Sequence, residues 1–186
     1  MFRRSDKMAT STQNTATAEN IMDYQKVAQD DLADEEQYLT FQITSEDYGI
    51  ELVQSKEVIK VPKITNVPNT EDYVLGVINL RGQIVPVIDL KKKLGLLNDN
   101  YDTSQEEKRI IVVQEEESLV GILVDKIKEV LSIKTDNIQE FAETETGISR
   151  ENIEGVFNAG EELVIIIDIN EILFKDRENN IDEESA

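Results

Sequence analysis

The side chains that most often carry out catalysis are missing from this 186-residue sequence, which contains no His, no Cys and no Trp. Imidazole acid–base relays, thiol nucleophiles, disulfides and metal sites built from His or Cys are therefore excluded. Acidic side chains remain, and they gather at positions 115–117 and at Glu161 and Glu162. Both groups fall in expected hairpin turns without the alternating spacing of a calcium loop, so we interpret them as solvated charge. We expect neither a metal nor a cofactor; an enzyme with a carboxylate-based site stays open as an alternative.

The overall charge restricts the partners. The chain holds 39 Asp and Glu against 19 Lys and Arg, a formal net charge of −20. Because phosphate binding needs clustered Lys and Arg, nucleic acid and anionic membrane surfaces are disfavoured as partners. The sequence also has no Gly-rich phosphate loop and no apolar run of 18 residues. We expect a cytoplasmic protein without membrane insertion, whose surface serves protein contacts.

Two polar tails flank the expected folded part. Residues 1–36 and 175–186 are rich in small polar and charged residues, which leaves 37–174 as the domain. The end of the first tail carries spaced apolar residues that fit either a weak amphipathic helix or a solvated linker. These residues are Ile21, Met22, Tyr24, Val27 and Leu32.

The elements of the domain are mostly strands. Alternation in YLTFQI and unbroken apolar runs such as IIVV and LVIII predict strands, and clusters of Gly, Asn, Asp and Ser separate them. Short helices are expected after Asp89 and Asp168, each with the Asp as N-cap. Pro86 lies inside the run IVPVID, where its missing N–H predicts an edge strand or a bulge.

The domain contains an internal repeat. GVINLRGQIVPVIDLKKKL from Gly76 aligns without gaps with GVFNAGEELVIIIDINEIL from Gly155, and seven of the 19 pairs are identical. Upstream, YGIELVQSKEVI from Tyr48 aligns with VGILVDKIKEVL from Val120. We therefore expect two copies, about 37–97 and 98–174, with strands that can be exchanged between them. Units of this size are marginal alone, which favours packing of the two copies together.

The copies differ at one turn. Asn79 to Gln83 bridge two apolar runs and predict a hairpin in which Gly82 supplies a positive φ. Gly160 occupies the position of Arg81 in the second copy, so Arg81 is either a partner-binding guanidinium or a surface residue bonded to Glu57. Residues 38–97 are neutral, with seven basic and seven acidic residues, whereas 98–174 hold six and 19. Either the first copy meets an acidic partner that the second would repel, or the difference in charge serves only solubility.

Four blocks in this order resemble the CheW family of bacterial chemotaxis coupling proteins: YGIELVQSKEVI, GVINLRGQIVPVIDL, VGILVDKIKEVLSI and GVFNAGEELVIIIDINEIL. The turn NLRG is the most diagnostic part, and the resemblance covers roughly residues 37–174. It implies a mostly β fold of two packed five-stranded barrels of the Src-homology-3 type with a few short helices. It also implies a non-catalytic adaptor that couples methyl-accepting chemoreceptors to the histidine kinase CheA.

The resemblance further implies where the partners bind. The receptor tip is expected in the groove between the barrels, and the regulatory domain of CheA is expected to contact the chain barrel to barrel. Carried over by position, the receptor-facing residues are Ser55, Glu57, Gly76, Arg81, Gly121, Ile127 and Val130. Ser55 stands where the family pattern leads us to expect a more apolar residue. The glycines would let a receptor helix approach closely.

Some expectations remain general. The kinase-contact residues are not assigned, although exposed apolar side chains at the barrel ends are expected to supply them. The chain is expected to be a monomer in isolation and to join membrane-associated chemoreceptor arrays through its partners. A free-standing relative of the CheA regulatory domain is the alternative within the same signalling system.

Overall fold

The computed structural model describes residues 35–96, 104–115, 117–141 and 148–174, so both predicted tails lie outside the described residues apart from Glu35 and Glu36. Strands make up most of these segments, joined by short helical turns. The strands are β1 (Glu35–Ile43), β2 (Glu46–Glu51), β3 (Ser55–Lys60), β4 (Val74–Leu80), β5 (Gln83–Asp89), β6 (Arg109–Glu115), β7 (Ser118–Val124), β8 (Lys126–Lys134), β9 (Ile153–Ala159) and β10 (Glu162–Ile167). The helical pieces are η1 (Leu52–Gln54), α2 (Leu90–Lys93), η2 (Thr135–Asn137), η3 (Arg150–Asn152) and residues 169–174.

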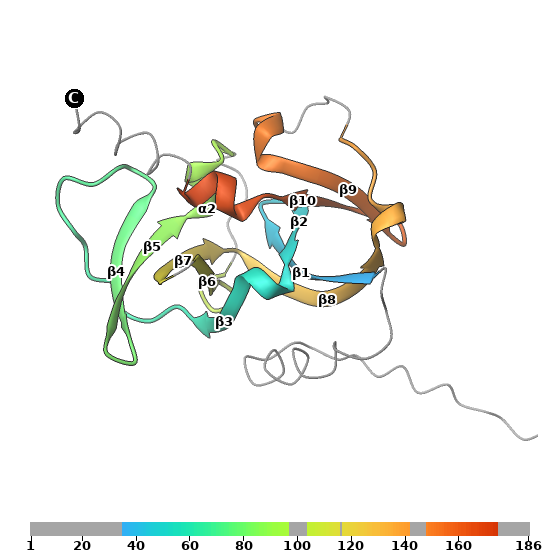
Figure 1. Ribbon diagram of the computed structural model, residues 1–186. Coiled ribbons are helices and arrows are strands. Elements are labelled where there is room, and N and C mark those ends of the chain that lie inside the picture. Colours follow the sequence, from blue (N-terminus) through green and yellow to red (C-terminus); the bar gives the residue numbers. More distant parts are fainter. Residues whose placement is uncertain (1–34, 97–103, 116, 142–147, 175–186) are drawn as a thin grey trace, which may run out of the picture.

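The strands form two five-stranded sheets, each curled into a small barrel (Figure 1). We call the sheet with the order β3-β6-β7-β5-β4 barrel I, and the sheet with the order β8-β1-β2-β10-β9 barrel II. Figure 1 shows barrel I on the left and barrel II on the right. This arrangement confirms the expected fold class of mostly β structure in two packed barrels with a few short helices.

The two sheets are equivalent under the sequence repeat, but neither is made from one copy. The aligned blocks relate β2 to β7, β3 to β8, β4 to β9 and β5 to β10, and both sheets then have the same strand order. Barrel I takes β6 and β7 from the second copy, and barrel II takes β1 and β2 from the first. The chain crosses between the barrels at η1 and again between β7 and β8. Each barrel is therefore assembled from both halves of the domain.

Three apolar clusters explain the unbroken apolar runs. One cluster fills barrel I, one fills barrel II, and the largest lies between the barrels. In β6, Ile110 and Val112 face the barrel I cluster while Ile111 and Val113 face the central one. β10 divides its residues between barrel II and the centre in the same way. A strand buried on both faces needs apolar residues at every position, which is why IIVV and LVIII do not alternate.

The connections match the predicted helix caps and the expected gap at Pro86. Asp89 accepts a hydrogen bond from the backbone N–H of Lys92, and Asp168 accepts one from the backbone N–H of Glu171. β5 as a whole lies between β7 and β4, but its pairing with β7 begins only at Val87. At Pro86 the strand is therefore paired with β4 alone, which is the local edge that the missing N–H predicted.

Each barrel is closed in the same way across its open side. In barrel I, Thr65 and Val77 exchange two backbone hydrogen bonds of 2.8 Å, and in barrel II Gln139 and Val156 exchange a similar pair. The connection between β3 and β4 thus pairs with β4, and the connection between β8 and β9 pairs with β9. No helix in the described part of the chain is long and apolar enough to cross a membrane.

Candidate functional site

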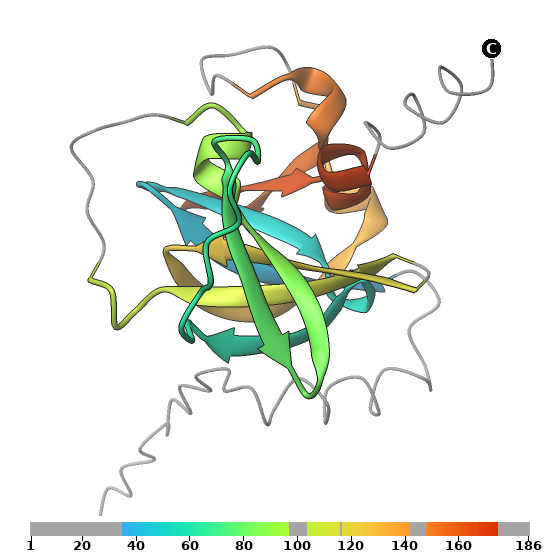
Figure 2. The same cartoon turned by 90° about the vertical axis from the view of Figure 1, so that its left-hand side faces the viewer.

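The hairpin between β4 and β5 is held in one conformation by its backbone. Its two turn residues, Arg81 and Gly82, have φ values of 51° and 89°. Two positive φ angles give the turn the twist that a two-residue hairpin requires. The Asn79 side chain accepts a hydrogen bond of 2.8 Å from the Gly82 N–H. Figure 2 shows this green hairpin in front of the other strands, with its turn pointing downward. Arg81 lies in that turn, between the end of β4 and the start of β5.

Arg81 is oriented by a carboxylate on the opposite edge of barrel I. Its Nη2 lies 2.9 Å from Oε2 of Glu57 in β3, where 69% of the Arg81 side chain but only 12% of the Glu57 side chain is exposed. An ion pair with this much exposure adds less than about 1 kcal/mol to stability. The pair therefore fixes the direction of the guanidinium, whose other N–H groups stay accessible to a partner.

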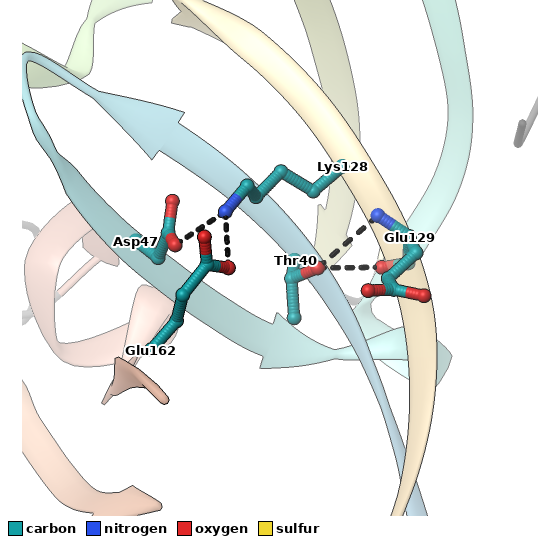
Figure 3. Close-up of polar contacts among 5 residues, drawn as sticks. All are labelled: Thr40, Asp47, Lys128, Glu129 and Glu162. Atoms are coloured by element: carbon teal, nitrogen blue, oxygen red, sulfur yellow. Dashed lines mark hydrogen bonds and ion pairs between the residues drawn. The ribbon is translucent and has the colours of Figure 1, made fainter. Parts of the chain in front are cut away.

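The equivalent end of barrel II carries a different polar cluster (Figure 3). Lys128 Nζ lies 2.5 Å from Asp47 Oδ2 and 2.7 Å from Glu162 Oε2. Burial alone would lower the Lys128 pKa, but the hydrogen bonds and charges of the two carboxylates raise it overall. Hydrogen bonding to Lys128 in turn lowers the pKa of the exposed Glu162 carboxyl. This end of barrel II therefore carries Lys128 bound to two carboxylates, with Gly160 at the position that Arg81 has in barrel I.

Near this cluster, the Thr40 side chain replaces backbone pairing between β1 and β8. The register of these two strands shifts between Leu39 and Phe41, on either side of Thr40. The Thr40 hydroxyl donates to the Glu129 carbonyl at 2.8 Å and accepts from the Glu129 N–H at 3.2 Å (Figure 3). One side chain thus satisfies two backbone groups that the bulge leaves without strand partners.

Three of the predicted receptor-facing residues lie inside the molecule. Ser55 is 1% exposed, and its hydroxyl donates to the Leu52 carbonyl at 2.9 Å. Gly76 has a φ of 134°, and a Cβ there would lie 2.1 Å from the Thr65 carbonyl oxygen. A Cβ on buried Gly121 would lie 2.8 Å from the Ile110 side chain. The close approach that these glycines permit is made by the chain itself, which corrects the reason we gave for them.

The remaining predicted residues are at least partly accessible: Arg81 lies in the hairpin turn, and the other three lie on two edge strands. Glu57 lies on β3 and pairs with Arg81, whereas Ile127 and Val130 lie on β8. Ile127 and Val130 are half-buried and pack against the central cluster. Figure 1 shows β3 and β8 along the same lower side of the molecule. The accessible part of the predicted set is therefore divided between the two barrels.

Three exposed apolar residues were not predicted by number. Val53 in η1 is 81% exposed, Ile84 is 66% exposed and Leu163 is 49% exposed. Ile84 and Leu163 occupy equivalent positions of the repeat, each as the second residue of the strand that follows the hairpin turn. Counting the alternation from buried Val85 would have placed Ile84 on the outer face, so the sequence did contain this signal.

The carboxylates do not assemble into a metal site within the described residues: no group of three or more is arranged to hold an ion there. Glu162, one of the residues singled out from the sequence, is engaged with Lys128. At the other end of barrel II, burial together with the charges of Glu51, Asp168 and Glu36 raises the pKa of Glu154 to about 7. Burial and the neighbouring acids also raise the pKa of Glu51.

Comparisons with known proteins agree with this geometry. The family model described as CheW-like domain matches residues 37–177. A chemotaxis protein CheW from Bacillus subtilis is 35% identical over 141 residues, which cover 76% of this chain and 88% of the relative. The CheW of Klebsiella aerogenes is 34% identical over 74% of this chain and 81% of its own length. In the chemotaxis protein CheV3 of Helicobacter pylori the match, 30% identical over 68% of this chain, covers only 40% of the relative.

A solved structure shares the fold as well. The scaffolding protein TtCheW from Thermoanaerobacter tengcongensis matches with a TM-score of 0.68 and 30% identity, over 77% of this chain and 90% of that one. CheW proteins are non-catalytic chemotaxis adaptors, which removes the alternative of a carboxylate-based enzyme. The chain belongs to the CheW family of chemotaxis coupling proteins.

Proposed function

We propose that this chain couples the cytoplasmic tips of methyl-accepting chemoreceptors to the regulatory domain of the histidine kinase CheA. The observation that carries the proposal is the Arg81–Glu57 pair, because it holds an exposed guanidinium on a rigid turn. The equivalent turn of barrel II has Gly160 in place of the arginine. A structural role alone would not need Arg81 to be 69% exposed. In the cell, the protein is cytoplasmic and reaches the membrane-associated arrays through its partners.

The receptor surface that we propose runs between β3 and β8. Arg81 supplies hydrogen-bond donors for main-chain or carboxylate oxygens of the receptor tip, and Glu57 sets their direction. Ile127 and Val130 supply apolar area on the other barrel. Ser55, Gly76 and Gly121 act from below this surface by fixing the strands that carry it.

The kinase contact uses a different part of the molecule in this proposal. The regulatory domain of CheA is expected to bind barrel to barrel, which calls for exposed apolar side chains at a barrel end. Leu163 on barrel II meets this requirement and lies beside the exposed Glu162. In isolation the chain is a monomer, and the kinase completes the contact.

The test is a pull-down with a purified receptor tip and a purified kinase regulatory domain, used separately and together. Arg81→Glu should weaken receptor binding at least tenfold and leave kinase binding unchanged, while Leu163→Asp should do the reverse. Arg150→Glu is the matched control, since it makes the same substitution at an exposed position of η3, which belongs to neither of the two strands of the proposed surface. Ile127→Asp and Val130→Asp should weaken receptor binding, provided that thermal unfolding shows them folded.

A charge swap separates contact from structure. The double variant Glu57→Arg with Arg81→Glu can reform the ion pair in reverse, so it should recover the stability of the parent but not its receptor binding. Recovery of receptor binding would mean that the pair is only structural. Binding of the parent chain to neither partner would overturn the coupling function as a whole.

A further inference from the structure

A cleft opens into barrel II between its two edge strands. It has a volume of about 360 Å³ and lies where β8 and β9 face each other across the open side of the sheet. Its apolar floor is formed by Leu131, Ile133, Phe157 and Ala159, and its rim by Ser132, Asn137, Gln139 and Asn158. None of these side chains is charged, although the chain carries a net charge of −20. The cleft therefore suits an uncharged, apolar occupant with backbone groups for the amides at the rim.

The repeat identifies what is missing from this cleft. At the equivalent place in barrel I, Ile59, Val61, Ile64 and Leu80 pack together against the barrel core. The repeat relates Leu80, the last residue of β4, to Ala159, the last residue of β9. Barrel II thus lacks one leucine side chain that barrel I has. Voids of this kind forfeit the packing contacts of the residues around them, so an aliphatic side chain that entered would be stabilised.

The chain itself supplies a leucine close to the opening. β1 begins at Glu35, which pairs with Lys134 of β8, and the next pair joins Glu36 to Ile133 on the floor of the cleft. The described part of the chain therefore begins beside the cleft. Leu32 precedes Glu35 by three residues, which an extended chain spans in about 10 Å. Its sequence neighbours Asp31 and Asp34 are acidic, and the exposed Lys134 at the end of β8 carries the opposite charge.

We infer that the segment before Glu35 docks across the opening of barrel II, with the Leu32 side chain in the cleft beside Ala159. Leu32 then packs against the core of barrel II, as Leu80 packs against the core of barrel I. The docked segment also covers the edge of β8 that has no strand partner among the described residues, which would otherwise be open to pairing with a foreign strand. This inference does not depend on the coupling function.

Disulfide trapping in the full-length chain tests the inference, because the absence of native cysteines gives a clean background. Leu32→Cys with Ala159→Cys should form an intramolecular disulfide at least tenfold faster than the control pair Leu32→Cys with Ile84→Cys, whose second position lies on barrel I. Equal rates for the two pairs would overturn the inference. A disulfide-linked dimer as the main product would also overturn it, since the occupant would then be a second copy.

A second measurement uses no new cysteine. Leu32→Ser should speed hydrogen exchange of the amides in β9 and at the end of β8 by about threefold or more. Filling the cleft with Ala159→Leu should abolish this effect of Leu32→Ser. Unchanged exchange in the Leu32→Ser variant, or the same acceleration when the cleft is filled, contradicts docking at this place.

Discussion

Replacing Gly76 by Ala distinguishes two roles for this residue, which are a direct contact with the receptor and the closure of barrel I. The residue has a φ of 134°, a conformation that side chains rarely adopt, and its missing Cβ faces the backbone of the segment that closes barrel I. The Cβ of an alanine would lie 2.1 Å from the Thr65 carbonyl oxygen and 2.8 Å from its carbon. Neither atom belongs to a flexible side chain, so the backbone itself has to move.

The magnitude follows from what that movement breaks. Holding a non-glycine residue in such a conformation costs about 1–3 kcal/mol. Displacing the Thr65 segment also breaks the two hydrogen bonds that it exchanges with Val77, at about 1 kcal/mol each. Gly76→Ala should therefore destabilise the protein by about 4 kcal/mol, which lowers the melting temperature by roughly 10 °C for a domain of this size.

Urea denaturation followed by circular dichroism measures this loss, and Gly82→Ala is its matched control. Gly82 also has a positive φ, of 89°, but no atom lies within 4 Å of its missing Cβ. The control should therefore lose only about 1 kcal/mol. If Gly76→Ala is as stable as the control and yet fails to bind the receptor tip, Gly76 is a direct contact and the closure argument is refuted.

Two further predictions concern charged groups of barrel II. Glu154 has a pKa of about 7 in the folded state against an ordinary 4.5. The folded state therefore holds more protons between these values, and stability falls as the pH rises through this window. Glu154→Gln should remove about 1 kcal/mol of that fall between pH 5 and pH 8, after allowance for solvent screening; parallel pH profiles would contradict this. Lys128→Ala leaves the buried Asp47 without its cation and should cost about 2–3 kcal/mol, whereas Glu162→Ala should change stability little, because that side chain is 65% exposed. If the urea denaturation midpoint falls equally in both variants, the loss of stability in Lys128→Ala does not come from the unpaired Asp47.

The architecture could be predicted from the sequence because the two copies of the repeat contain the same succession of strands and turns. Pairs that are identical in both copies, such as Gly76 with Gly155, mark what each barrel needs to close. We interpreted Gly76 as functional because the family pattern pointed there, although its identical counterpart already indicated a role in folding. Arg81 has no counterpart, and the structure gives it the exposed position and the Glu57 partner that we expected.

Other features could not be predicted because they depend on contacts between distant segments. Asp47 and Lys128 lie 81 positions apart and meet only because β1 and β2 join the second barrel. Ser55 aligns with the half-buried Ile127, yet its hydroxyl is turned inward onto η1. The cleft depends on the size of one residue, Ala159, whose effect appears only when both barrels are compared.

The exchange of β1 and β2 between the copies also has a mechanical consequence. The most extensive strand pair joins β1 to β8, so residues about 90 positions apart must meet before barrel II exists. Such distant pairing slows folding. It also means that barrel I, built from the continuous stretch β3 to β7, is inserted between β2 and β8 of barrel II. Both ends of barrel I are therefore tied to barrel II, and the two barrels share the central apolar cluster. The position of a partner bound to one barrel is thus passed to the other through two chain connections and a common core.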